Sequence, residues 1–227
     1  MTYEGLRLKV LEIKRKLFAK YWNRKLSVKD FSILSNNCWG GMISECYGLK
    51  KNSPTVGLFF AAADYIEFLS YLDDYIHSEL KIIDPSETKW INSDIVRTPK
   101  YGTYPVGRLT CERGKIDIFF LHYHSNEEAI VKWNNRCKRI NTNKLIVKFN
   151  DQNGCKEEDI EKFVKLKYQN KLFFTCKSWA NEKEYVDILG DGYQRINQFP
   201  KSDSIRASYE PFVDDRRLNL TKRINSL

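Results

Sequence analysis

The stretch FSILSNNCWGGM, residues 31–42, carries the main signal for the fold. Residues 31–35 predict a short buried strand, residues 36–38 form a polar tip, and residues 39–41 loosen the backbone before a helix that begins near Met42. A strand that ends in amides, a thiol and two glycines is typical of a βα ligand loop. Glycines let the main chain approach a ligand, and the following helix points its unpaired N–H groups at the same place. The alternative is a βα turn in which the asparagines only cap the helix.

The rest of the chain alternates predicted strands and helices. The predicted strands are 56–60, 80–83, 115–123, 144–149 and 171–176, and the predicted helices are 42–47, 61–76, 125–140 and 157–165. Most of these strands are continuous apolar runs, which is typical of a parallel sheet covered by helices on both faces. We therefore predict an α/β fold, a three-layer α/β/α arrangement with a mostly parallel, Rossmann-like sheet. Residues 86–103 carry no clear pattern.

Length and composition favour one folded α/β domain with additions at its ends. The 227 residues are 42% hydrophobic and 14% aromatic, which is enough for a sizeable core. We predict a basic amphipathic helix at 1–28, an α/β domain at 29–180, and a C-terminal extension at 181–227 that packs on the domain or trails from it. The sequence contains neither an uninterrupted apolar run of membrane-spanning length nor a signal-peptide pattern, so we expect a cytoplasmic protein. The six cysteines form no CxxC pair, so we expect reduced thiols.

The formal charge of +9 is concentrated at the two ends of the chain. Residues 1–29 hold nine Lys or Arg against two acidic residues, whereas residues 30–200 are balanced in charge. A nucleic-acid-binding domain would carry basic residues on its own body, so we expect no nucleic-acid partner.

The N-terminal helix predicted over residues 3–22 is amphipathic and basic. Its apolar positions have helical spacing, and lysines fill much of the remaining surface; the apolar positions are Leu6, Val10, Ile13, Leu17 and Tyr21. We expect this face to pack on the domain while the lysines stay solvated. The alternative is peripheral contact with an anionic membrane surface.

Polar residues that can do chemistry recur at the carboxyl ends of the predicted strands, which meet at one edge of a parallel sheet. The candidate catalytic residues are Cys38, His122 and Asp151. The candidate substrate-binding residues are Asn36, Asn37, Trp39, Gly40, His124, Asn150, Gln152, Asn153 and Thr175. Amides both donate and accept hydrogen bonds, so this set suits hydroxyl-rich or nucleotide ligands.

Three kinds of chemistry fit these residues. His122 can act as a general base or simply form hydrogen bonds at a strand end. Cys38 beside His122, with Asp151 orienting the imidazole, would form a nucleophile pair; the alternative is a structural thiol in a tight turn. His122 and His124 share one strand face and could hold zinc with Asp151 as third ligand. Two histidines alone do not complete a zinc site, so we expect no metal site.

Four separated stretches resemble an uncharacterised bacterial family, a domain of unknown function whose members are often labelled exopolysaccharide biosynthesis proteins. They are FSILSNNCWGGMISECYGLKKNSPTVGLFF, YPVGRL, FFLHYHSNEEAIVKWNNRCKRIN and VKFNDQNGCKEEDIEKF, within about residues 30–180. The family pattern includes the SNNCWGG turn, the NSP turn, the LHY strand end and the F-x-D-x-x-G-C/T turn. His124 is a position where the family often has Lys, which favours His122 alone. The resemblance implies a role in surface-polysaccharide assembly without fixing a reaction.

These observations lead to one main functional hypothesis and two alternatives. The first is a transferase in exopolysaccharide or surface-glycan biosynthesis that acts on a sugar, a sugar nucleotide or a glycan, with His122 or Asp151 as base. The second is a Cys38-dependent acyltransferase or hydrolase, and the third is a non-catalytic protein that binds a glycan or nucleotide. The expected partner is a small-molecule or glycan substrate, and the sequence identifies neither a cofactor nor an oligomeric state.

Overall fold

The strands form two four-stranded sheets, one parallel and one antiparallel. The computed structural model describes residues 3–196, 210 and 218–227. The parallel sheet has the order β1 (Ser32–Ser35), β6 (Leu145–Asn150), β7 (Asn170–Thr175) and β8 (Tyr193–Arg195). The antiparallel sheet has the order β2 (Phe59–Phe60), β5 (Gly114–Phe119), β4 (Val106–Cys111) and β3 (Leu80–Ile83). The predicted α/β class is confirmed, and the separate antiparallel sheet is a feature that the sequence patterns did not predict.

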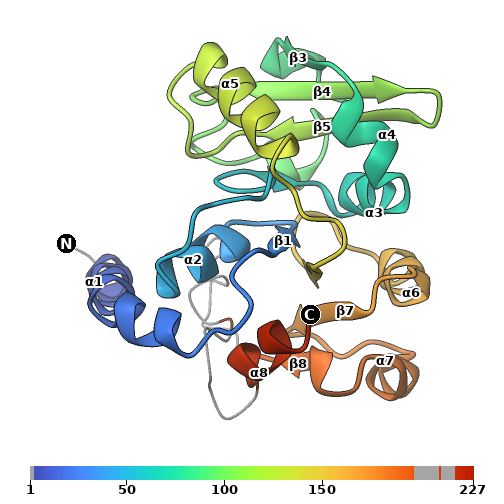
Figure 1. Cartoon of the computed structure of the whole chain (residues 1–227). Helices are drawn as coiled ribbons and strands as arrows, with labels where there is room; N and C mark the ends of the chain where they lie inside the picture. Colours follow the sequence, from blue (N-terminus) through green and yellow to red (C-terminus); the bar gives the residue numbers. More distant parts are fainter. Residues whose placement is uncertain (1–2, 197–209, 211–217) are drawn as a thin grey trace.

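The parallel sheet lies between two layers of helices (Figure 1). The helices are α1 (Tyr3–Arg24), α2 (Trp39–Cys46), α3 (Ala62–Ser70), α4 (Leu72–His77), α5 (Asn126–Cys137), α6 (Glu157–Lys165), α7 (Glu182–Leu189) and α8 (Leu220–Asn225), and short 3-10 turns occupy Pro85–Glu87, Asp94–Val96 and Gly190–Gly192. One face of the sheet packs against α2 and α8 in a core that includes Ile43, Ile146 and Ile224. The other face packs against α3, α6 and α7 in a core that includes Phe149 and Phe163.

Strand β6 shows why this sheet is buried on both faces. All six of its residues are buried. Successive side chains of a strand point to opposite faces, so Val147 and Phe149 enter the core of α3 and α6. Ile146, Lys148 and Asn150 therefore point toward α2. On that face the apolar Ile146 is followed by the polar Lys148 and Asn150, which lie nearest the carboxyl end of the strand.

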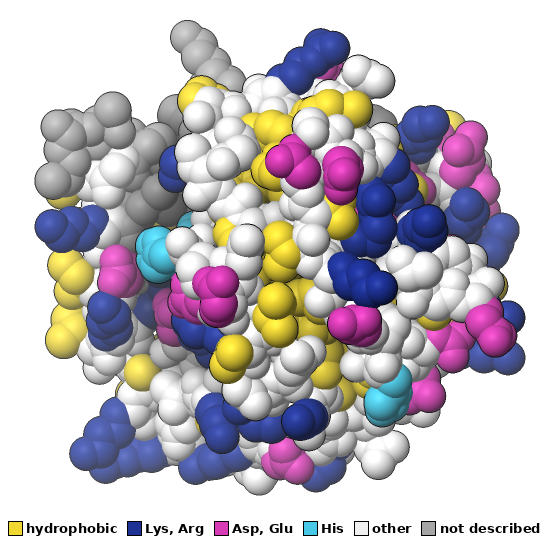
Figure 2. All heavy atoms as spheres, turned by 90° about the horizontal axis from the view of Figure 1, so that it is seen from above, with side chains coloured by type: hydrophobic (Ala, Val, Ile, Leu, Met, Phe, Trp, Pro, Cys, Tyr) yellow, Lys and Arg dark blue, Asp and Glu magenta, His cyan; other side chains and the backbone are white. Residues whose placement is uncertain are grey.

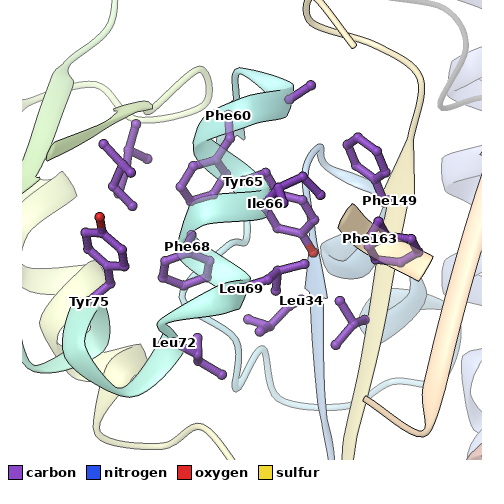
Figure 3. Packing of buried hydrophobic residues seen from close by; sticks show 14 of the residues in the cluster. Leu34, Phe60, Tyr65, Ile66, Phe68, Leu69, Leu72, Tyr75, Phe149 and Phe163 are labelled. Carbon is purple, nitrogen blue, oxygen red and sulfur yellow. The ribbon is translucent and has the colours of Figure 1, made fainter. Parts of the chain in front are cut away.

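Helix α3 lies between the two sheets and joins them (Figure 3). Its Tyr65 ring stacks on Phe149 of the parallel sheet at 6.0 Å between centroids, and its Phe68 ring stacks on Phe60 of the antiparallel sheet at 5.3 Å. The single helix predicted over 61–76 is divided at Tyr71, where the backbone leaves the helical conformation. Aromatic packing on both sides makes α3 the central element of the largest core.

The strand predicted over 115–123 belongs to the antiparallel sheet, which corrects its expected place in the parallel one. Strand β5 pairs with β4 from Cys111↔Gly114 to Val106↔Phe119. A tight hairpin closes only a short loop, whereas parallel pairing needs a long crossover connection. The end of β5 is therefore not one of the carboxyl ends that line the edge of the parallel sheet, and this changes the position of His122.

Residues 86–103 are attached to the antiparallel sheet by two buried carboxylates. The Thr88 hydroxyl donates to Asp117 at 2.8 Å, and the Trp90 indole N–H donates to Asp64 at 2.6 Å. The backbone N–H of Asp117 in turn donates to Asp64 at 3.0 Å. Buried carboxylates require such donors, so this segment has a defined attachment despite its lack of periodicity.

The C-terminal region contributes to the parallel sheet and its layers. Within the predicted extension 181–227, helix α7 covers one face of the sheet, β8 is its edge strand, and α8 packs on the other face. Residues 197–209 and 211–217 of that extension lie outside the described residues. The parallel sheet therefore extends beyond residue 180.

Helix α1 packs against α2, but through a different face from the one predicted. Ala19 lies against Gly48, the Asn23 amide donates to the Tyr47 carbonyl at 2.8 Å, and Arg15 forms an ion pair with Glu45 at 3.7 Å. The predicted apolar face is exposed instead. The expectation that this face packs on the domain is therefore wrong. Among the described residues, no helix is long and apolar enough to cross a bilayer.

Candidate functional site

Polar residues from β1 and β6 meet at the carboxyl edge of the parallel sheet. Asn36 and Asn37 directly follow β1, Asn150 ends the neighbouring β6, and Gln152 lies two residues further on. Helix α2, which follows β1, covers one face of the sheet, whereas α6, which follows β6, covers the other. Because the connections that follow these adjacent strands leave to opposite faces, the carboxyl edge between them is open to a ligand, and ligands of parallel α/β sheets bind outside the carboxyl ends of the strands.

At this point lies a cluster of polar side chains that we call the buried polar cluster. It consists of Asn36, Asn37, Lys148, Asn150, Gln152 and Glu210, each at most 7% exposed. At its centre, Nζ of Lys148 lies 2.6 Å from Oε1 of Glu210, and both side chains are fully buried. A buried ion pair requires further hydrogen bonds to offset its desolvation, and the surrounding amides supply them.

The Glu210 carboxylate accepts hydrogen bonds from three side chains. Lys148 donates to Oε1 at 2.6 Å, Asn150 donates to Oε1 at 2.7 Å, and Asn37 donates to Oε2 at 3.3 Å. Lys148 also donates to Oδ1 of Asn37 at 3.0 Å. One ammonium and two amide N–H₂ groups thus converge on a single carboxylate. This donor set can hold a carboxylate or a phosphate oxygen.

The amide of Asn150 is oriented by Asn36. The Asn36 side chain donates to Oδ1 of Asn150 at 2.8 Å and accepts from the Asn150 backbone N–H at 3.1 Å. Because Oδ1 of Asn150 is held this way, its N–H₂ group points to Glu210 and to Oε1 of Gln152, which it reaches at 2.7 Å. The predicted residues Asn36, Asn150 and Gln152 therefore act as one network.

Trp39 and Gly40 occupy the first turn of α2, which begins earlier than the predicted Met42. The Trp39 ring packs edge-on against Phe174, and Nζ of Lys148 lies 6.0 Å from its centroid. A Cβ on Gly40 would lie 3.1 Å from Cγ2 and 3.2 Å from the backbone oxygen of Ile33. The glycine thus lets α2 approach its own strand, a role that differs from the predicted approach to a ligand.

Asp151 and Thr175 form a second buried group at the same edge. The Thr175 hydroxyl donates to Oδ2 of Asp151 at 2.6 Å and accepts from the Trp179 indole N–H at 2.9 Å. Asn153 is structural: its positive φ of 56° suits the turn, and its amide donates to the Phe60 carbonyl at 2.9 Å. Asp151, which follows Asn150 in the sequence, is therefore a second buried carboxylate at this edge, and Asn153 ties the two sheets together.

His122 and His124 follow β5 of the antiparallel sheet, rather than a strand of the parallel sheet as predicted, and both side chains are exposed. The backbone N–H of His122 donates to the Gly57 carbonyl at 3.0 Å, and that of His124 donates to Glu128 at 2.7 Å. Partial desolvation of the imidazole, together with the positive charge of Lys100, lowers the pKa of His122. The described part of the chain contains no group of three or more His, Cys, Asp or Glu residues placed to hold a metal ion.

Cys38 is the N-cap residue of α2, but its surroundings do not favour a thiolate. Desolvation raises the pKa of the Cys38 thiol to about 12, although Lys148 acts in the opposite direction. No hydrogen bond joins Cys38 to His122 among the described residues, and Glu210 adds a negative charge nearby that also raises the pKa. The arrangement does not provide the activated Cys–His pair that the second functional hypothesis requires.

This environment predicts slow alkylation of Cys38. Because the thiolate is the reactive form, its labelling rate with iodoacetamide should rise about tenfold per pH unit and show no plateau below pH 10. Peptide mapping by mass spectrometry over a pH series measures this rate for each cysteine in the same sample. A plateau near the ordinary thiol pKa of about 8.5, or below it, would contradict the assignment of Cys38 as a desolvated structural thiol.

Sequence reasoning missed the two charged members of the buried polar cluster. Lys148 was visible as a lysine inside the apolar run LIVKF, where a strand buried on both faces has no solvated position for it. That anomaly could have identified it. Glu210 lies in a polar region with no periodic pattern, 60 residues from Asn150, and the sequence offers no signal that brings it to the sheet.

Comparison with known proteins agrees with the resemblance seen in the sequence. Residues 9–214 match the family described as a domain of unknown function, DUF1919. An uncharacterized protein of Haemophilus influenzae is 30% identical over 175 residues, which cover 77% of this chain and 75% of that protein. Residues 9–214, which match the family, include every residue of the buried polar cluster. The chain therefore belongs to the DUF1919 family.

Proposed function

We propose that the chain is a transferase of surface-glycan biosynthesis that binds a phosphorylated sugar donor, such as a sugar nucleotide, at the buried polar cluster. The observation that carries this proposal is the carboxylate of Glu210, held by Lys148 and two amides at the carboxyl edge of the parallel sheet. A site that holds both oxygens of one carboxylate through an ammonium and two N–H₂ groups has the donors that a phosphate needs. The resemblance to proteins labelled as exopolysaccharide biosynthesis proteins supports the choice of a sugar donor.

In this proposal a donor phosphate takes the place of the Glu210 carboxylate. Lys148 then offsets the negative charge on the leaving phosphate, while the amides of Asn37 and Asn150, which hold Glu210 in this structure, bind donor oxygens. The acceptor hydroxyl oxygen forms the new bond to the anomeric carbon, and the bond from that carbon to the phosphate oxygen breaks, so the phosphate leaves with the electron pair. Asp151, the second buried carboxylate at the same edge, accepts the hydroxyl proton.

The proposal predicts that sugar nucleotides bind through Lys148. We expect UDP-glucose, GDP-mannose or inorganic pyrophosphate to raise the melting temperature of the wild-type protein, because a ligand that binds only the native state stabilises it. The matching unphosphorylated sugars should have no effect. Titration calorimetry should show at least a tenfold loss of affinity in Lys148→Gln, since a charged hydrogen bond contributes about 1.5–3 kcal/mol.

Two variants complete this test. Lys183→Gln is the matched control, because Lys183 is exposed on α7 and should leave the affinity unchanged. Asp151→Asn should keep the affinity but slow the release of nucleoside diphosphate in the presence of an acceptor. A bound sugar nucleotide with no turnover on any acceptor would favour a binding protein. Equal affinity in the wild type and Lys148→Gln would rule out the site.

A further inference from the structure

Helix α1 exposes a continuous apolar stripe along its length. Six large hydrophobic side chains are between 43% and 72% exposed, with Leu17 the most exposed; they are Leu6, Val10, Ile13, Leu17, Phe18 and Tyr21. Their spacing places Leu6, Val10, Ile13, Leu17 and Tyr21 on one side of the helix, and Phe18 lies beyond the edge of this stripe. At 1.5 Å per residue, the 22-residue helix is about 33 Å long. Soluble proteins rarely leave such an ordered apolar surface uncovered without a binding role.

The stripe is directed away from the domain because the opposite side of α1 is anchored. Trp22 lies edge-on to Tyr47 at 6.4 Å, and Ala19 faces Gly48. The anchored side and the stripe are therefore separate, and a partner can contact the stripe while α1 stays packed on α2. In Figure 2 the left edge, where α1 lies in Figure 1, carries hydrophobic side chains next to Lys and Arg.

Exposed lysines border the stripe on both sides. By helical position, Lys9, Lys16 and Lys20 lie along one border, and Lys14 and Lys25 lie along the other. The acidic Glu12 lies beyond the first border and forms an ion pair with Lys16 at 2.6 Å. A second copy of the chain placed against this stripe would bring like charges together, which disfavours self-association. A negatively charged partner with an apolar layer matches both features.

We propose that α1 docks on the surface of an anionic lipid bilayer. The stripe enters the boundary between headgroups and acyl chains, and the bordering lysines extend to the anionic headgroups. Each basic residue near such a surface contributes about 1 kcal/mol of attraction, and this contribution weakens with salt. The helix lies in the plane of the interface and does not span it. This inference rests on α1 alone and is independent of the proposed transfer reaction.

Co-sedimentation with vesicles tests the proposal. The full chain should bind vesicles of phosphatidylcholine and phosphatidylserine, and should bind pure phosphatidylcholine or the anionic vesicles at high salt much more weakly. Leu17→Glu should lower binding to the anionic vesicles by at least about tenfold, because it removes a leucine that would enter the bilayer and adds a charge that the anionic headgroups repel. Leu17 is exposed, so its substitution should leave the fold intact, which thermal melting verifies.

The matched control is Ile188→Glu on α7, which changes an exposed isoleucine of similar size outside the stripe. It should bind like the wild type. Equal binding of the two variants, or no binding of the wild type to anionic vesicles, would overturn the proposal. So would a wild-type dimer that Leu17→Glu dissociates, because the stripe would then be a self-association surface.

Discussion

Replacing Lys148 by Met is expected to lower the free energy of unfolding by about 3–5 kcal/mol, the usual cost of removing one partner from a buried ion pair. Nζ of Lys148 lies 2.6 Å from Oε1 of Glu210, and both side chains are fully buried. In the variant the Glu210 carboxylate would therefore lose its counter-charge without becoming exposed to solvent. Chemical denaturation at neutral pH measures this loss. A cost of that size is a large fraction of the stability of an ordinary domain.

The double variant Lys148→Met/Glu210→Gln separates the pair from its individual residues. Once both charges are gone, no uncompensated charge remains, so the double variant should be more stable than the sum of the two single losses predicts, by more than about 1 kcal/mol. The control is Glu182→Gln, which breaks the partly exposed pair with Arg195 and should cost less than about 1 kcal/mol. Strict additivity, or a small loss for Lys148→Met, would mean that water reaches the pair.

The parallel half of the fold follows from local patterns, and the antiparallel half does not. Strand β6 and helix α6 can be predicted from the sequence because each carries a strong apolar pattern within one short segment. The partner of a strand, however, depends on residues far along the chain. Strand β5 has the same apolar appearance as β6 but pairs with β2 and β4, and its sequence does not distinguish these outcomes.

The residues of the candidate site likewise divide into those that local sequence patterns predict and those that depend on distant parts of the chain. Asn36, Asn37 and Asn150 were predictable because the carboxyl ends of parallel strands share one edge. The strand before His122 was assigned to the wrong sheet, because its apolar pattern does not show which strands it pairs with. Glu210 was not predictable because its contacts with the cluster join segments separated by up to 173 residues.

Replacing Glu210 by Ala is expected to create a site for small anions. The substitution removes the carboxylate but leaves Lys148 Nζ and the amides of Asn37 and Asn150 around the space that it filled. Formate, acetate or phosphate should therefore bind there and raise the melting temperature of the variant as their concentration increases. An anion at one hundred times its dissociation constant would restore about 2.7 kcal/mol of stability. The wild type should respond much less, because its own carboxylate already occupies the donors.

Glu210→Gln is the matched control for this experiment, because glutamine removes the charge but keeps the space filled. Anion rescue should therefore be strong in Glu210→Ala and weak in Glu210→Gln, and chloride at equal ionic strength corrects for general salt effects. The same comparison tests the proposed donor site. A sugar nucleotide that must displace the carboxylate in the wild type should bind Glu210→Ala at least about tenfold more tightly, because that competition is gone. If Glu210→Ala shows neither rescue nor tighter binding, the donors around Lys148 serve the buried ion pair alone, and the phosphate must bind elsewhere.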